Sequence, residues 1–408
     1  MSLTASSVGQ PRVVKQLTSL LTPKALEQEF DFIAGNANSG MIYGWVLRDE
    51  AERLSGREVP YVYVREEQKK GGQQERITGN SNNPSINQGD RVLIVESEDD
   101  PDIFLTKVNS SVEALREAGY QPNQVATILQ PSSEVVRRLQ ELGLMLSYSV
   151  KPDDLKDIIA SGGIRRTLQT QQIPYELGNP MEIAPRIIEA GALEIRDIDG
   201  GEKPFLYSSG NWGPGYLMIK GLVGQPHLMK YLCAQVALRV PKDRVDFVVG
   251  NVTGGLIPGW EIRNNLEMQK GEEVPFVYVE GSRVSEGRMI GEEDNHLVRK
   301  GDKSLVVEEL VNFLQTTTNS VLLSRHRGYD AKLAATILHY KNPIALKQLG
   351  EHGLELFYVV SLPDIIDAAE RSPMFKPRAV ADYRRFLENP LKWQADRGYE
   401  PVREGGTR

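Results

Sequence analysis

The chain has 408 residues, of which 40% are hydrophobic, and a formal net charge of −7. This length predicts two or three domains, and the negative charge gives no general attraction for nucleic acids or anionic membranes. The only cysteine, Cys233, excludes disulfides within the chain and indicates a reducing, cytoplasmic location. No apolar run approaches the ~20 residues of a membrane span, the first residues do not resemble a signal peptide, and Cys233 is expected to be a buried small hydrophobe.

Short apolar runs alternate with longer helical patterns in the first part of the chain. We expect residues 1–11 to be loose and residues 13–21 to form a short helix. Fully apolar strands between helices are typical of a parallel sheet that is covered on both faces. The runs of this kind lie at residues 32–34, 61–64, 92–95, 125–129 and 144–150. We therefore predict an α/β domain over residues 12–165.

A second α/β domain is predicted over residues 181–370, after a polar connector at 166–180. It opens with a helix and with a region that has no counterpart in the first part, where short strands surround a turn at 208–213. The tail, residues 371–408, contains a helical pattern at 381–388. We expect the tail to dock on the protein because it carries Phe386, Leu387, Leu391 and Trp393.

One stretch of sequence occurs twice. Residues 31–45 read DFIAGNANSGMIYGW, and residues 246–260 read DFVVGNVTGGLIPGW. The repeat continues downstream, with 59–64 like 274–279, 89–96 like 301–308, and 126–129 like 335–338. Its period is far too long for a solenoid, so we predict a duplicated domain.

Each copy of this stretch predicts a strand, a glycine-containing loop and the start of a helix. Adjacent glycines leave backbone N–H groups bare, and a helix N-terminus favours negative charge. The loop in the second copy, with Gly254 and Gly255, is therefore a candidate anion cradle, although a tight strand-to-helix turn is the alternative. The first copy has only Gly40 there, so we expect anions to prefer the second copy. A Gly255→Val substitution is expected to block the cradle with little loss of fold.

The order and spacing of these motifs resemble those of the type I phosphoribosyltransferases, and among them orotate phosphoribosyltransferase. The resemblance covers residues 181–370 and, without a small N-terminal hood, residues 32–159. It implies two tandem α/β domains, each a parallel sheet with helices on both faces, the second with the hood. The motifs that carry it are Glu189-Ala190-Gly191-Ala192-Leu193, Ser208-Ser209-Gly210, the loop 253–258, the run 274–279, Glu308-Glu309 and the run 361–366.

This family transfers the phosphoribosyl group of phosphoribosyl pyrophosphate, bound with Mg²⁺, to a nitrogen of a nucleobase such as orotate. The resemblance therefore implies Mg²⁺ as a cofactor that enters with the donor, small-molecule partners, and no nucleic acid or membrane partner. Backbone amides must hold the pyrophosphate, and a lysine or arginine must offset its growing charge. The implied residues are Lys69 and Arg65 for catalysis, Thr253, Gly254, Gly255, Glu308, Glu309, Thr316, Thr317, Thr318, Asn319 and Ser320 for the donor, and Ser209, Gly210 and Trp212 for the base.

Departures from the family pattern leave two functions open. The loop for the 5′-phosphate, at residues 315–320, has no glycine, and His339-Tyr340 replaces the aspartate–arginine pair whose arginine contacts orotate. These losses favour an inactive protein with a binding, regulatory or assembly role. The intact loop at 253–258 favours an active phosphoribosyltransferase.

The losses of the two copies are complementary. The first keeps Arg65 and Lys69 but has a broken acid pair, Glu96-Ser97, whereas the second keeps the acids and has lost the loop lysine. Enzymes of this family work as dimers that exchange this loop. We therefore predict an intramolecular pseudo-dimer with one composite site, in which the Lys69 loop serves the second copy.

Several of these residues also have a purely structural interpretation. Glu308-Glu309 can also be a solvated strand end, and Trp212 can pack as well as stack on a base. Trp45 and Trp260 are expected to pack their helices on the sheets. The five histidines show no metal-ligand spacing, so no structural metal site is predicted.

Overall fold

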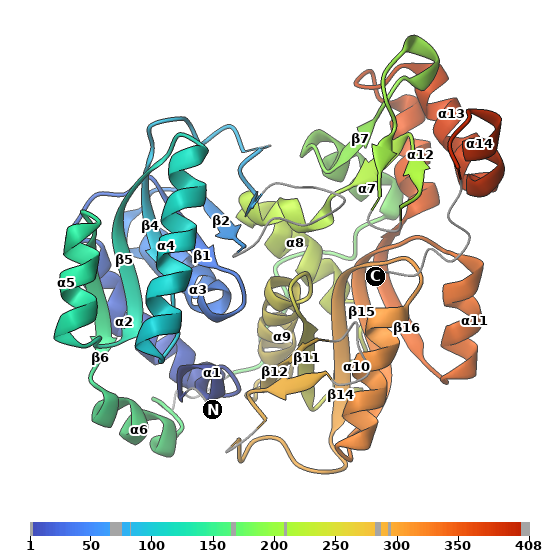
Figure 1. The fold of residues 1–408 in the computed structure, drawn as a ribbon. Coiled ribbons are helices and arrows are strands. Elements are labelled where there is room, and N and C mark those ends of the chain that lie inside the picture. Colours follow the sequence, from blue (N-terminus) through green and yellow to red (C-terminus); the bar gives the residue numbers. More distant parts are fainter. Residues whose placement is uncertain are drawn as a thin grey trace.

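The computed structural model describes residues 3–65, 76–81, 83–164, 169–207, 210–281, 287–292 and 295–400. They form two α/β domains that lie side by side, the first in blue to teal and the second mainly in yellow to orange (Figure 1). The predicted fold class, two tandem α/β domains, is confirmed.

The first domain alternates strands and helices along the chain. Its helices are α1 (Leu3–Ser7), α2 (Pro11–Ala25), α3 (Ser39–Ser55), α4 (Pro101–Glu117), α5 (Ser133–Glu141) and α6 (Pro152–Ser161). Its strands are β1 (Phe32–Asn36), β2 (Tyr61–Val64), β3 (Ile77–Thr78), β4 (Arg91–Val95), β5 (Gln121–Leu129) and β6 (Met145–Val150).

The second domain begins with a hood of short elements. These are α7 (Pro180–Glu189), β7 (Leu193–Ile195), η1 (Ile198–Gly200), β8 (Phe205–Leu206), β9 (Trp212–Gly213), β10 (Gly215–Leu217) and η2 (Ile219–Gly224). The main part contains α8 (Pro226–Ala237), η3 (Lys242–Arg244), β11 (Phe247–Asn251), α9 (Leu256–Lys270), β12 (Phe276–Glu280), β13 (Arg288–Ile290), β14 (Lys303–Val311), α10 (Gln315–His326), β15 (Asp330–His339), α11 (Pro343–Glu351), β16 (Glu355–Ser361) and α12 (Leu362–Arg371). The tail forms α13 (Pro377–Glu388) and α14 (Pro390–Asp396).

The two main sheets have the same topology. Their strand orders are β3-β2-β1-β4-β5-β6 and β13-β12-β11-β14-β15-β16. Ile33 pairs with Tyr61 and Leu93, and the corresponding Val248 pairs with Phe276 and Leu305. The expectation of purely parallel sheets is wrong at one edge, because β3 and β13 run antiparallel to their neighbours.

Helices cover both faces of each sheet. In the first domain α2 and α3 lie on the face toward the second domain, and α4 and α5 pack on the outer face. In the second domain α8 and α9 lie on the face toward the first, and α10 and α11 on the outer face. A single apolar cluster contains inner-face residues of both sheets, including Ile33 and Val248, so the two domains share one core.

Corresponding residues of the two domains exchange contacts across the boundary. The amide of Asn295 donates to the carbonyl of Gly9 at 2.9 Å, and the amide of Asn83 donates to the carbonyl of Gly224. The stretch Gly9-Gln10-Pro11 recurs as Gly224-Gln225-Pro226, a part of the repeat that the sequence reading missed. The contact is therefore reciprocal, as in an isologous interface.

Corresponding lysines form ion pairs across the boundary one helix further in, although with acids at different places in the repeat. Lys15 on α2 lies 2.8 Å from Glu267 on α9, and Lys230, at the corresponding place on α8, lies 2.6 Å from Asp49 on α3. Between these pairs the buried Trp45 donates its Nε1–H to Glu261 at 2.7 Å. Trp45 and Trp260 are both buried against their domains, as predicted.

The N-terminal segment differs from its prediction. From Leu3 onward it is not loose, because α1 is helical and Thr4 and Ser7 are buried beside the first sheet. The short helix expected at 13–21 extends over Pro11–Ala25, since Pro11 occupies its first turn. Among the described residues, no helix combines the length and apolarity needed to cross a bilayer.

Candidate functional site

The loop between β11 and α9 lies against the backbone of β14. A methyl group added at Gly255 would lie 2.1 Å from the carbonyl oxygen of Val307 and 2.7 Å from the amide of Asn251. In the first domain, a methyl group at Gly40 would lie 1.9 Å from the carbonyl oxygen of Val95. Glycine is therefore required in both copies by close backbone approach, and the expectation that valine at 255 would spare the fold is wrong.

Gly254 faces a side chain instead of backbone. A methyl group at this position would lie 1.5 Å from a carboxylate oxygen of Glu309. Glu309 is half-buried and Glu308 is buried, so this acid pair is not a solvated strand end. The amides of Thr253 and Gly254 form no hydrogen bond with another described residue. Glu309 and the loop thus lie together at the carboxyl edge of the second sheet.

The expected 5′-phosphate loop is helical. Thr316, Thr317, Thr318, Asn319 and Ser320 lie in the first two turns of α10. Ser320 is buried and donates to the side-chain oxygen of Asn251 at 2.5 Å, and Thr318 donates to Gln348 at 3.4 Å. The residue before this helix, Leu314, gives no side-chain cap. The N-terminal amides of α10 are consequently the groups here that suit a phosphate.

The corresponding edge of the first domain is filled by its own carboxylates. Asp100 caps α4 by accepting from the amides of Asp102 and Ile103 at 3.0 and 3.1 Å. Asp99 accepts from the amides of Leu3 and Thr4 in α1, and Glu96 accepts from two amides of its own loop. These acids occupy the places where an anion would need donors, so the two edges are not equivalent.

A tyrosine near the end of β2 in the first domain has a pKa that is affected by Glu309 of the second domain. Arg65 is buried and donates to the hydroxyls of Tyr63 and Thr78, each at 3.2 Å. Burial raises the pKa of Tyr63, and the charge of Glu309 raises it further against the opposing effect of Arg65. Thr78, which accepts from Arg65, directly precedes Gly79, whose backbone closely approaches Gly224 of the second domain, so Arg65 lies near the domain boundary. Lys69 lies outside the described residues.

The reverse relation holds at the first domain's acids. Burial raises the pKa of Tyr278, which corresponds to Tyr63, and Glu98 of the first domain adds to this effect. Tyr63 and Thr78 were missed by the sequence reading, although the recurrence of Tyr63 as Tyr278 marked the position. Each domain thus presents the end of its second strand to the other domain's acid segment.

The hood residues expected to line a base pocket contact the C-terminal tail. The ring of Trp212 stacks on Tyr399 with centroids 5.2 Å apart, and its backbone amide donates to Gln394 at 2.8 Å. Gly210 belongs to the turn just before Trp212, and Ser209 lies outside the described residues. Trp212 therefore packs against the protein, and it would have to exchange this contact to stack on a base.

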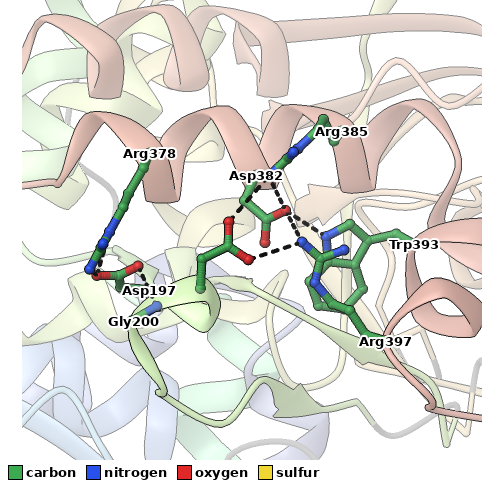
Figure 2. Close-up of polar contacts among 8 residues, drawn as sticks. Asp197, Gly200, Arg378, Asp382, Arg385, Trp393 and Arg397 are labelled. Atoms are coloured by element: carbon green, nitrogen blue, oxygen red, sulfur yellow. Dashed lines mark hydrogen bonds and ion pairs between the residues drawn. The ribbon is translucent and has the colours of Figure 1, made fainter.

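Ion pairs fix the tail to the hood (Figure 2). Arg378 and Lys376 pair with Asp197 beside η1, and Arg385 and Arg397 reach Asp199. Within the tail, the buried Asp382 accepts from Arg385 at 3.0 Å, from Arg397, and from Nε1 of Trp393 at 2.9 Å. The predicted docking of the tail is confirmed, with Phe386 and Trp393 buried.

Replacing Asp382 with alanine is expected to destabilise this docking by about 2–4 kcal/mol, because it leaves the buried Nε1–H of Trp393 and the largely covered guanidinium of Arg397 without their acceptor. Asp199→Ala is the matched control: that side chain is 51% exposed and its ion pairs are worth at most about 1 kcal/mol. Denaturant unfolding followed by tryptophan fluorescence measures both variants. Equal losses in the two variants would contradict the role given to Asp382.

His339 and Tyr340 end β15 at the same edge. Burial lowers the pKa of His339, whose ring lies edge-on to Tyr358 at 5.2 Å, and neither ring nitrogen hydrogen-bonds to a described residue. Burial also raises the pKa of Tyr340. The positive charge of the next residue, Lys341, lowers the pKa of His339 further. This part of the edge therefore has His339 and Tyr340 in place of the expected arginine, with the cation of Lys341 beside them.

Sequence comparison finds orotate phosphoribosyltransferases among the relatives of this chain. No family model matches the chain. Orotate phosphoribosyltransferase from Roseobacter denitrificans is 27% identical over 228 residues, which cover 54% of this chain and 97% of the relative. The enzyme of the same name from Streptococcus sanguinis is 23% identical over 216 residues, or 52% of this chain and 98% of the relative.

The chain resembles the orotate phosphoribosyltransferases. Each relative has about the length of one copy of the duplicated domain, which explains why half of this chain is covered. Among solved structures, Leishmania donovani UMP synthase aligns over 92% of this chain and 80% of its own, with 16% identity and a TM-score of 0.42. Orotate phosphoribosyltransferase from Aeropyrum pernix aligns over 46% of this chain and 98% of its own, with 22% identity and a TM-score of 0.37. The chain thus contains two diverged copies of one α/β fold and is similar in sequence to orotate phosphoribosyltransferases.

The residues of the phosphoribosyltransferase-like second domain suit Mg²⁺ only as a companion of a bound phosphate. In the part of the chain that the structure describes, no group of three or more acidic, histidine or cysteine side chains could hold a metal ion. Glu309 provides carboxylate oxygens beside the loop, and Glu308 is the buried residue before it in β14. Mg²⁺ is commonly held by one or two carboxylates together with substrate phosphates, so this acid pair fits that arrangement.

Proposed function

We propose that the protein is a phosphoribosyltransferase with one composite site, built from the carboxyl edge of the second domain and the β2 end of the first. The observation that carries the proposal is the position of Glu309. It lies against Gly254 of its own domain, and the segment of the first domain that Arg65 contacts, at Thr78 and Gly79, lies against Gly224 of the same second domain. Loop amides, acids and the Arg65 side chain thus face one region from two domains.

In this site the amides of Thr253 and Gly254 would bind the pyrophosphate of the donor, and the N-terminal amides of α10 its 5′-phosphate. Glu308 and Glu309 would accept from the ribose hydroxyls. Bound Mg²⁺ would neutralise part of the pyrophosphate charge. Arg65 and Lys69 would offset the charge that grows as the C1′–O bond breaks, while the C1′–N bond forms and the base nitrogen loses its proton.

The reciprocal contacts of the two domains support pairing within one chain. Asn295–Gly9 and Asn83–Gly224 are related as the halves of an isologous interface would be. We propose that this boundary is a pseudo-dimer interface and that it presents the first domain's loop to the second domain. We also propose a cytoplasmic location, because the one cysteine of the chain, Cys233, is a buried free thiol and thiols stay reduced in that compartment.

The second candidate is a binding protein without turnover. The packing of Trp212 against Tyr399 and the neutral His339 and Tyr340 favour this function, because both features take the base side of the site away from orotate. Such a protein would bind the donor with Mg²⁺ and transmit its presence to a partner or an assembly. Donor binding is common to both candidates, and base-dependent turnover separates them.

The test measures pyrophosphate release from phosphoribosyl pyrophosphate and Mg²⁺ with orotate, uracil, adenine, hypoxanthine and guanine offered separately. Release that depends on one of these bases supports the enzyme. Saturable donor binding without release from any base selects the binding protein. Absence of donor binding would contradict both candidates.

A further inference from the structure

A cavity of about 520 Å³ opens between the domains, away from the carboxyl edges of the sheets. It lies where the last turns of α3 in the first domain meet the first turn of α8 in the second. Small-molecule sites commonly have volumes of roughly 300–1,000 Å³ and commonly lie between domains. The size and position of this cavity therefore suit a small ligand.

Cationic side chains dominate the lining. Arg48, Arg53, Arg57 and Lys230 face three carboxylates, and His227 adds a further imidazole. Lys230 and Arg48 are already engaged by Asp49 and Glu52. Arg53 and Arg57 are the groups left for a ligand.

The interactions of these two arginines with the rest of the protein could be replaced by interactions with a ligand. The Arg53 side chain is 65% exposed and donates two hydrogen bonds to Glu50 of its own helix, from Nε at 2.9 Å and from Nη2 at 2.5 Å. A surface pair of this kind is worth about 0–1 kcal/mol, so the guanidinium can turn to a new partner at little cost. Arg57 donates one Nη2 bond to the carbonyl of Phe30 and keeps its other donors for a ligand.

The pseudo-symmetric corner of the molecule provides an internal comparison. In the repeat, Met268 stands in the place of Arg53 and Glu272 in the place of Arg57. There Arg12 pairs with Glu273, Lys15 and Arg263 pair with Glu267, and Lys270 pairs with Glu272. The first corner differs in its two additional guanidinium groups, of which Arg53 pairs with Glu50 and Arg57 forms no ion pair with a described residue.

The two corners also differ in cover. A methyl group added at Gly56 would meet nothing within 4 Å, whereas one at the corresponding Gly271 would lie 2.8 Å from Thr170. The connector closes the second corner, and the amide of Gln171 donates to the carbonyl of Met268 at 2.8 Å. The two arginines that the repeat lacks thus occur only in the corner that stays open.

We propose that this open corner binds a small phosphate-bearing anion, such as a nucleoside monophosphate, at a site separate from the carboxyl edge. The guanidinium groups of Arg53 and Arg57 hold the phosphate, since arginine suits its planar, two-pronged recognition. His227 and Lys230 line the cavity from the other domain, where they pair with Glu52 and Asp49 of the first. A ligand held from both sides stabilises the paired arrangement of the domains.

The experiment titrates inorganic phosphate, pyrophosphate and uridine 5′-monophosphate by calorimetry into the full chain and into the double variant Arg53→Met with Arg57→Glu. This variant gives the open corner the residues of the covered corner. Arg137→Met with Arg138→Glu makes the same charge change on the exposed helix α5 and is the control. We expect one or more probes to bind roughly tenfold or more weakly to the corner variant and unchanged to the control.

Arg53→Met alone, at an exposed position, keeps the test valid if the double variant loses stability. Equal weakening in the corner and control variants would show a general charge effect and overturn the proposal. Absence of saturable binding of every probe would overturn it as well. Binding of phosphoribosyl pyrophosphate with Mg²⁺, measured in the same variants, is expected to be unchanged, so the outcome is distinct from that for the composite site.

Discussion

Valine in place of Gly255 is expected to unfold the second domain or to destabilise it by more than ~4 kcal/mol. The first carbon of the new side chain would lie 2.1 Å from the carbonyl oxygen of Val307 and 2.7 Å from the amide of Asn251. Both are backbone atoms of central strands, which cannot move aside without breaking the sheet. Losses of this size are typical of overpacking and backbone clashes in a core.

Gly254→Ala provides the matched comparison, because its new carbon meets only the side chain of Glu309. That carboxylate can turn away, so we expect a loss of stability under about 1.5 kcal/mol together with weaker donor binding. Thermal and denaturant unfolding measure the two variants side by side. A stable Gly255→Val protein would show that the loop does not have the close contact with β14 described here.

Lys69→Ala and Arg65→Ala are expected to lower turnover by roughly 100-fold or more, if the site is composite. Removal of one preorganised group that stabilises charge in the transition state costs on the order of 100–1,000-fold. Arg65 also donates hydrogen bonds to the hydroxyls of Tyr63 and Thr78, each at 3.2 Å, so its removal is expected to lower the stability of the fold as well. Lys69→Ala is the cleaner variant, and we expect its unfolding to match that of the parent protein.

Arg288→Ala is the control for these two variants. Arg288 opens β13 in the second domain, opposite Glu280 of β12. The acids Asp99 and Asp100 at the first domain's edge are occupied by α1 and by the cap of α4, so we expect this variant to keep its turnover. Initial rates of pyrophosphate release compare the three proteins. Equal losses from Arg65→Ala and Arg288→Ala would mean that both edges work.

The fold could be predicted from the sequence because the two repeated segments contain the same order of strands and helices. Phe32 and Phe247 open equivalent central strands, and the apolar runs fell on the strands that the structure has. The antiparallel strands β3 and β13 could not be predicted, since they have two and three residues and no alternating pattern. Whether such a short segment becomes a strand depends on its pairing with a neighbouring strand, which is a tertiary effect.

The site was harder to predict than the fold. Thr316, Thr317 and Thr318 have low helix propensity, which favoured a loop, but burial and the bond of Ser320 to Asn251 make this segment helical. The contact of Trp212 with Gln394 and Tyr399 joins residues far apart in the chain, which periodicity cannot reveal. The recurrence of Gly9-Gln10-Pro11 was visible in the sequence, and it would have indicated that the repeat begins before residue 12.

The stoichiometry of donor binding tests the composite site most directly. Calorimetric titration of the full chain with phosphoribosyl pyrophosphate and Mg²⁺ should give one molecule bound per chain, because the first domain's edge is filled by Asp99, Asp100 and α1. The same titration of Lys69→Ala should still give one molecule, bound more weakly. A single site shared between the domains would be contradicted by two equivalent molecules per chain. It would also be contradicted by one molecule that binds Lys69→Ala as tightly as the parent protein.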